Sequence, residues 1–166
     1  EALAEAGFLA RSEKRHETVS LRGHLNEVLR GLALLREHVD ADVNHVGVMG
    51  FSRGGLLTLQ VAIQEGNSVQ AVILMAPAHG KEQLNKSLND VSFIDAPVEI
   101  YVSENDLNQA NHVQLAHDIG DALTIAGKTV NLTIYPSYGD DGHMLFDKVQ
   151  EPYWSDVLAF LENHLK

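Results

Sequence analysis

The stretch that decides the fold is Val46-Gly47-Val48-Met49-Gly50-Phe51-Ser52-Arg53-Gly54-Gly55. It is a short apolar run that ends in Gly-x-Ser-x-Gly, and a helix-favouring segment, residues 56–65, follows at once. That order predicts a strand, a sharp turn that carries the serine, and a helix. Gly50 and Gly54 have no Cβ where the turn is tight and where the helix and strand backbones nearly touch.

Ser52 is therefore expected at a strained corner with its hydroxyl exposed. The backbone N–H of Arg53 would then point to the place where an oxyanion forms during acyl transfer. The alternative is a Gly-rich turn from strand to helix in which the serine is a bystander.

Length and composition bound the classes of protein that this chain can represent. With 166 residues, of which 45% are hydrophobic, it is the size of one domain and can bury a core, which excludes a disordered chain. The net charge of −11, without a clustered basic stripe, argues against nucleic acid and anionic membranes as partners. The absence of cysteine excludes disulfides and thiolate metal sites and fits a reducing compartment, so we expect a cytoplasmic location.

Apolar segments alternate along the chain with amphipathic segments. The apolar segments predict strands, and the amphipathic segments predict helices. The predicted strands are residues 46–49, 69–75, 98–102 and 130–135, and the predicted helices are residues 24–38, 56–65, 81–90, 109–126 and a final helix from Pro152. Such alternation predicts an α/β fold, with a parallel sheet that carries helices on both faces. Ligands in such sheets bind beyond the carboxyl ends of the strands.

Three predicted strands end in reactive side chains, and they do so in the order Ser52, Asp106, His143. A serine hydroxyl needs a base beside it, a histidine has a suitable pKa, and a carboxylate fixes the tautomer of that histidine. Asp106 has two rivals: Glu104 lies closer to the strand end, and Asp95 precedes the strand. Asp106 is favoured because a carboxylate needs a few residues of turn to reach across to a histidine.

Other residues permit two interpretations each. His79 follows the second strand, so it either points into a substrate pocket or is an ordinary loop histidine. Phe51 is a candidate for the same pocket, and core packing is its alternative. His112 and His117 are five apart on a predicted helix and do not share a face well, so we expect no metal pair there.

These motifs together resemble the α/β-hydrolase superfamily, and within it the dienelactone hydrolases and the prolyl-oligopeptidase-type catalytic domains. The resemblance covers essentially the whole chain and rests on Gly-Phe-Ser-Arg-Gly-Gly at 50–55, Ser-Glu-Asn-Asp at 103–106 and Asp-Gly-His-Met-Leu-Phe at 141–146. It implies that Ser52 is the nucleophile, Asp106 the acid and His143 the base. The implied activity is hydrolysis of an ester, lactone or amide of a small molecule through an acyl-enzyme, without a metal or an organic cofactor.

Two departures from the family modify this expectation. Dienelactone hydrolases proper use a cysteine nucleophile, so the serine favours a carboxylesterase or, as an alternative, a peptidase of the prolyl-oligopeptidase type. The chain also opens without a methionine, inside an apparent helix at residues 1–6, and nothing corresponds to the family's early strands or to the loop that supplies a second oxyanion N–H.

We therefore expect a single α/β-hydrolase domain, residues 1–166, that is the C-terminal portion of a longer hydrolase domain. Its partner would be its own N-terminal segment or a second copy. A non-catalytic binding module of hydrolase fold is the competing hypothesis.

Overall fold

A four-stranded parallel sheet forms the centre of this computed structural model, which describes residues 1–12, 21 and 23–166. Its strands are neighbours in chain order: β1 (Gly47–Phe51), β2 (Ala71–Met75), β3 (Val98–Ser103) and β4 (Val130–Tyr135). The register pairs Val48 with Val72, Val72 with Val98, and Val98 with Val130. Because every pairing is parallel, the carboxyl ends of all four strands lie along one edge of the sheet.

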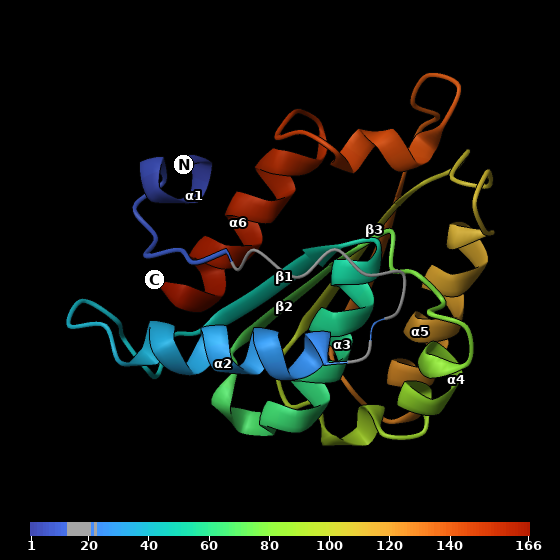
Figure 1. Ribbon diagram of the computed structural model, residues 1–166. Helices are drawn as coiled ribbons and strands as arrows, with labels where there is room; N and C mark the ends of the chain where they lie inside the picture. Colours follow the sequence, from blue (N-terminus) through green and yellow to red (C-terminus); the bar gives the residue numbers. More distant parts are fainter. Residues whose placement is uncertain (13–20, 22) are drawn as a thin grey trace.

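Helices cover both faces of this sheet, as Figure 1 shows. On one face lie α2 (His24–Arg36), α3 (Arg53–Glu65), α4 (Gln83–Leu88) and α5 (His112–Ile125), and on the other lie α1 (Ala2–Glu5) and α6 (Tyr153–Leu165). Short 3-10 helices, η1 (Gly66–Ser68), η2 (Val91–Phe93) and η3 (Gly142–Phe146), complete the connections. The predicted fold class, a parallel α/β sheet with helices on both faces, is confirmed.

The central strand β2 shows why the sequence folds in this way. All five of its residues are buried, and successive side chains of a strand point to opposite faces. Val72 and Leu74 enter the core beneath α3 and α5, whereas Ile73 and Met75 enter the core beneath α6. An unbroken apolar run is therefore required here, which is typical of a strand covered on both faces.

The predicted boundaries differ from the observed ones by up to about three residues at every element except β4. The strand predicted over residues 46–49 runs from Gly47 to Phe51, so it continues up to the turn itself. The helix predicted over residues 109–126 begins only at His112, because the Asn111 side chain accepts a hydrogen bond from the Gln114 N–H at 2.9 Å and caps it. The final helix begins at Tyr153, and Pro152 is its N-cap residue.

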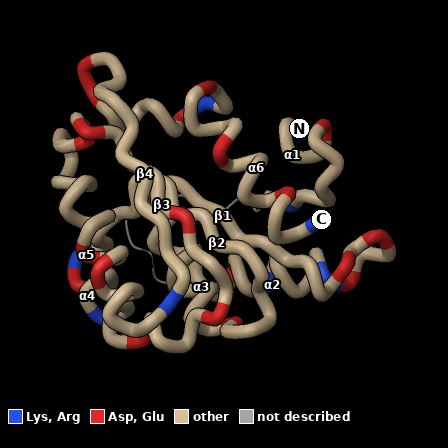
Figure 2. The backbone as a smooth tube through the Cα atoms, turned by 180° about the vertical axis from the view of Figure 1, so that it is seen from behind, with Lys and Arg blue, Asp and Glu red and all other residues tan. Residues whose placement is uncertain are grey.

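Charged residues lie mostly on the outer helices and loops, and acidic residues are spread around the molecule in the view of Figure 2. None of the helices in the described part of the chain is long and apolar enough to cross a membrane.

Candidate active site

Ser52 lies in a strained turn between β1 and α3. Its φ of 55° and ψ of −117° place a non-glycine residue in a sparsely populated region of backbone space. Three hydrogen bonds hold this conformation: the Ser52 N–H donates to Met75 O at 2.8 Å, and the Ser52 carbonyl accepts from the Ala78 and Leu56 N–H groups at 3.0 and 3.2 Å. The turn therefore projects the serine beyond the end of the strand.

Gly50 allows the strand and the helix to approach each other at this turn. A Cβ on Gly50 would lie 2.3 Å from the carbonyl oxygen of Gly54 and 2.5 Å from Thr58 Oγ1. These distances are too short for any side chain, so the motif requires glycine at this position for close approach rather than for an unusual φ.

Asp106 follows β3 after a two-residue turn and is fully buried. The rival carboxylates lie elsewhere. Glu104 is exposed and accepts hydrogen bonds from the side chain and the backbone N–H of Ser137, which lower the pKa of that carboxyl. Asp95 is also exposed and pairs with Lys128 at 3.4 Å. Of the three candidates, Asp106 is the one that the structure places beside His143.

His143 lies in η3, a short 3-10 helix, rather than in the open loop that the sequence pattern indicated. The side chain of Asp141 caps this helix by accepting the His143 N–H at 3.1 Å, and this contact fixes the backbone that carries the ring. Gly142 lies against the loop of the acid: a Cβ there would be 2.8 Å from Asp106 N and 2.5 Å from Asn105 Oδ1. The glycine before the histidine thus permits close contact between the two loops.

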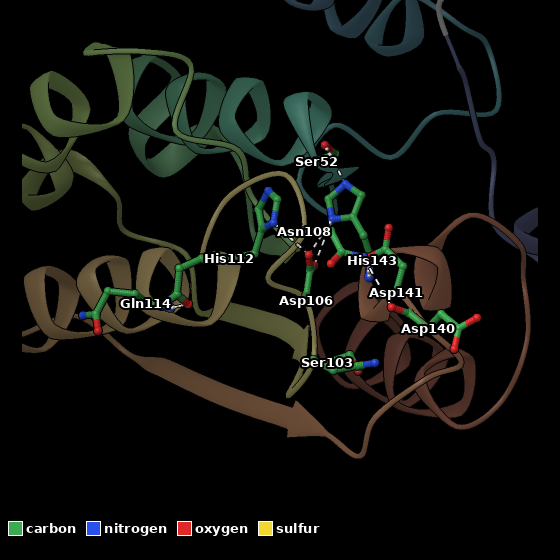
Figure 3. A network of polar contacts seen from close by, with 11 residues as sticks. Ser52, Ser103, Asp106, Asn108, His112, Gln114, Asp140, Asp141 and His143 are labelled. Carbon is green, nitrogen blue, oxygen red and sulfur yellow. Dashed lines mark hydrogen bonds and ion pairs between the residues drawn. The ribbon is translucent and has the colours of Figure 1, made fainter.

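The three side chains form a continuous chain of hydrogen bonds, seen in Figure 3. His143 Nε2 lies 3.0 Å from Ser52 Oγ, and His143 Nδ1 lies 2.9 Å and 3.1 Å from Oδ2 and Oδ1 of Asp106. With a proton on Nδ1, the ring donates to the carboxylate, and Nε2 is free to accept from the serine hydroxyl. This arrangement can remove a proton from Ser52.

Opposing effects act on the pKa of Asp106. Burial is the largest and would raise it, but hydrogen bonds from His112 and then His143, with the charges of those rings, outweigh burial and lower the pKa. The carboxylate is therefore ionised at neutral pH. Because its folded-state pKa is depressed, its contribution to stability is present above the usual value of 3.8 and is lost as the pH falls through the lowered pKa.

His112 is the residue that sequence reasoning missed. It is 2% exposed, and its Nδ1 lies 2.8 Å from Oδ1 of Asp106. Its imidazole ring also lies against that of His143, with centroids 4.4 Å apart and an interplanar angle of 32°. The available signal was its position at the start of the helix that follows the acid, where the chain turns back toward the strand end.

The other predicted site residues, Arg53, Phe51 and His79, have different positions relative to the hydrogen-bonded side chains of Ser52, His143 and Asp106. Arg53 is the first residue of α3, so its backbone N–H belongs to the helix turn that lacks intrahelical acceptors. The Phe51 ring packs against His143 with centroids 4.6 Å apart. His79 is exposed, and its Nδ1 accepts a hydrogen bond from the Lys81 N–H at 2.8 Å.

Asp106, His112 and His143 also form a group whose spacing would suit a metal ion, since one ligand atom from each lies within 4.8 Å of the others. In the structure these atoms hydrogen-bond to one another. His117 is exposed on α5 and is not a member of this group.

A groove of about 610 Å³ runs beside β1 and reaches the turn that carries the serine. We call it the β1 groove. Its lining includes the backbone of β1 and apolar side chains from both helical layers, among them Phe8, Leu32, Leu57, Leu161 and Leu165. Phe51 lines this groove and also contacts His143, so it connects the groove with the hydrogen-bonded chain.

A family model for the dienelactone hydrolase family matches residues 6–165 of this chain. The chain belongs to the dienelactone hydrolase family. No curated protein sequence gives a significant match.

Solved structures of hydrolases share the fold of this family member. A dienelactone hydrolase candidate from Klebsiella pneumoniae subsp. pneumoniae MGH 78578 is similar with a TM-score of 0.69 at 19% identity, over 89% of this chain and 63% of the other. Acylaminoacyl peptidase from Pyrococcus horikoshii gives 0.70 at 20% identity, over 86% of this chain and 28% of the peptidase.

Acetyl xylan esterase from Paenibacillus sp. R4 gives a TM-score of 0.63 at 16% identity, over 87% of this chain and 53% of the esterase. The chain thus spans about a quarter of the length of the matched peptidase and between half and two thirds of the length of the two smaller proteins.

Proposed function

We propose that this chain is a serine hydrolase that cleaves an ester or lactone bond of a small acyl substrate through an acyl-enzyme on Ser52. The observation that carries the proposal is the chain of contacts from Ser52 Oγ through the His143 ring to the Asp106 carboxylate. A second support is membership of the dienelactone hydrolase family.

In the first half-reaction, Ser52 Oγ attacks the carbonyl carbon of the substrate while His143 Nε2 takes the hydroxyl proton. Asp106 stabilises the imidazolium that forms and keeps the Nδ1 tautomer. The tetrahedral intermediate then expels the alcohol, whose oxygen receives the proton from Nε2, and the acyl group stays on Ser52. A water molecule repeats the sequence in the second half-reaction, which releases the acid and restores the serine.

The negative charge on the carbonyl oxygen needs donors that are already in place. The Arg53 N–H, in the first turn of α3, is the donor that we propose for one side of this oxyanion, and the positive end of the helix dipole assists it. A second donor would contribute roughly 2.7–4 kcal/mol of transition-state stabilisation.

We propose an ester rather than a peptide as the substrate because an alkoxide leaves far more readily than the amide anion that a peptide bond would release without prior protonation. A peptidase of the prolyl-oligopeptidase type would also need an acidic pair for the amino group of its substrate, and the sequence offers no identifiable pair. Phe51, beside His143 and on the wall of the β1 groove, is the side chain that we propose for contact with the acyl group.

The test is a fluorophosphonate label combined with turnover of p-nitrophenyl acetate and a series of longer p-nitrophenyl esters. The wild-type chain is expected to react covalently, and Ser52→Ala is expected to lose both the label and the turnover. Ser155→Ala, which changes an exposed serine on α6, is the matched control and should keep both. Turnover that persists in Ser52→Ala would show that Ser52 is not the nucleophile.

The same experiment separates the competing functions. A folded wild-type chain without label or turnover would support a binding module of hydrolase fold. Faster cleavage of peptide p-nitroanilides than of the esters would instead support the peptidase.

A further inference from the structure

His112 is a buried, polar side chain that the proposed reaction does not use. It begins α5, and Figure 3 shows its ring beside that of His143, with both rings turned toward the Asp106 carboxylate. Burial of a polar ring is costly unless it is hydrogen-bonded, and the partner of this ring is the Asp106 carboxylate at 2.8 Å. The burial and the contact together suggest a role in holding the acid.

Two contacts connect His112 with Asp106. The ring Nδ1 meets Oδ1 of the carboxylate, and the backbone N–H of His112 donates to the backbone carbonyl of Asp106 at 3.1 Å. The loop between the strand and α5 is therefore closed at its base by a main-chain bond and by a side-chain bond. Both bonds fix the acid relative to a long helix whose Ala116 and Ile119 are fully buried.

The contacts on the carboxylate restrain its orientation. Oδ2 lies 2.9 Å from His143 Nδ1, whereas Oδ1 lies 2.8 Å from His112 Nδ1 and 3.1 Å from His143 Nδ1. With one ring as partner, the carboxylate could rotate about its Cβ–Cγ bond and still keep a hydrogen bond. A second donor at Oδ1 limits that rotation, and hydrogen bonds to a charged acceptor are stronger than those between neutral groups.

We propose that His112 is a positioning residue for the Ser52–His143–Asp106 reaction, which acts by holding the Asp106 carboxylate in the plane that meets His143. This inference rests on the proposed function. Its effect should appear in kcat rather than in KM, because His112 contacts Asp106 and the ring of His143 and does not line the β1 groove. Misplacement of a catalytic group by about 1 Å can cost roughly 100-fold in rate, so loss of His112 should lower kcat by roughly 10- to 100-fold.

The experiment compares His112→Leu with His112→Asn in the 166-residue chain. Asparagine places an amide N–H at the same distance along the side chain as Nδ1, so it can still donate to Asp106, whereas leucine cannot. The expected result is a 10- to 100-fold fall in kcat for His112→Leu with unchanged KM. The Asn variant should recover most of that loss.

Two controls accompany the comparison. The same substitutions at His117, which is exposed on the same helix, should leave kcat unchanged. If His112→Leu does not fold, His112→Gln replaces it, because its longer side chain keeps the polarity but moves the amide beyond the position of Nδ1. Urea unfolding of each variant separates a loss of folded protein from a loss of rate.

Several outcomes would overturn the inference. Wild-type kcat in His112→Leu, an equal loss in the Leu and Asn variants, or a change confined to KM would each do so while leaving Ser52 as nucleophile. A wild-type chain that neither labels nor hydrolyses esters would overturn the proposed function and, with it, this role of His112.

Discussion

The two sides of Ser52 differ in how completely the described residues enclose them. On the base side, His143 is 5% exposed and Asp106 fully buried, and two loops and the start of α5 meet through hydrogen bonds. On the other side, every residue of β1 is only half-buried, β2 is the one strand in the described part of the chain that pairs with it, and the β1 groove runs alongside. The position of His143, the proposed base, therefore depends on dense local contacts, whereas the position of the β1 edge depends on fewer contacts. Substitutions should be costly on the first side and milder on the second, except at Gly50, where a side chain would collide with α3.

The largest expected effect is that of Asp106→Asn on the base side. An amide in place of the carboxylate can hold His143 in the wrong tautomer and cannot stabilise the imidazolium, so kcat for p-nitrophenyl acetate should fall by roughly 10⁴-fold. Asp141→Asn is the matched control, because the Asp141 side chain accepts the backbone N–H of His143 and an asparagine oxygen can still accept it, so kcat should change little. Equal losses in the two variants would contradict the assignment of Asp106 as the acid.

A second comparison uses two glycines: Gly142 on the His143 side of Ser52 and Gly47 on the β1 side. A Cβ at Gly142 would lie 2.8 Å from the backbone N of Asp106, which cannot move without moving the acid. A Cβ at Gly47 on β1 would lie 2.8 Å from Cδ1 of Leu165, the end of a flexible side chain. Overpacking typically costs about 1–3 kcal/mol, so Gly142→Ala should lose about that much stability together with activity, and Gly47→Ala clearly less.

Urea unfolding and ester turnover of the two glycine variants measure this difference. A Gly47→Ala variant that is as unstable as Gly142→Ala would show that the β1 edge is as tightly packed as the base side.

The same contrast explains which features could be predicted from the sequence. The strand, turn and helix around Ser52 are local, and the order of Ser52, Asp106 and His143 along the chain follows from the ends of parallel strands, so these positions were accessible to pattern reasoning. The role of His112 was not, because its contact with Asp106 depends on how α5 returns toward β3. The short helix around His143 was missed for a similar reason: it depends on a cap from Asp141, two residues away, in a segment without apolar periodicity.

The boundaries of α5 show the limit of periodicity. Residues 109–111 continue the polar and apolar pattern of the helix, yet Asn111 caps it and the preceding residues remain in a loop. A capping side chain forms hydrogen bonds with backbone groups that would otherwise extend the helix. Whether it does so depends on local geometry, which the pattern of polar and apolar residues does not contain.

The smallest expected effect compares the same residue on neighbouring strands. Val48 on β1 and Val72 on β2 are register partners, and both side chains belong to the core beneath α3. Val72 is fully buried, whereas Val48 is half-buried. Truncation to alanine removes two methyl groups at about 0.8 kcal/mol each plus a cavity cost, so Val72→Ala should lose about 2–3 kcal/mol of stability and Val48→Ala about 1 kcal/mol.

The two variants carry the same substitution on neighbouring strands, so the difference in their stability reflects mainly how closely each valine is packed. Urea unfolding under identical conditions measures it. A cost at Val48 equal to that at Val72 would mean that the edge of β1 is covered as fully as the centre of the sheet, and the contrast between the two sides of Ser52 would not hold in solution. A smaller loss of stability in Val48→Ala than in Val72→Ala would support the view that β1 is an edge strand. The β1 side of Ser52 would then be held by fewer contacts than the side that contains His143 and Asp106.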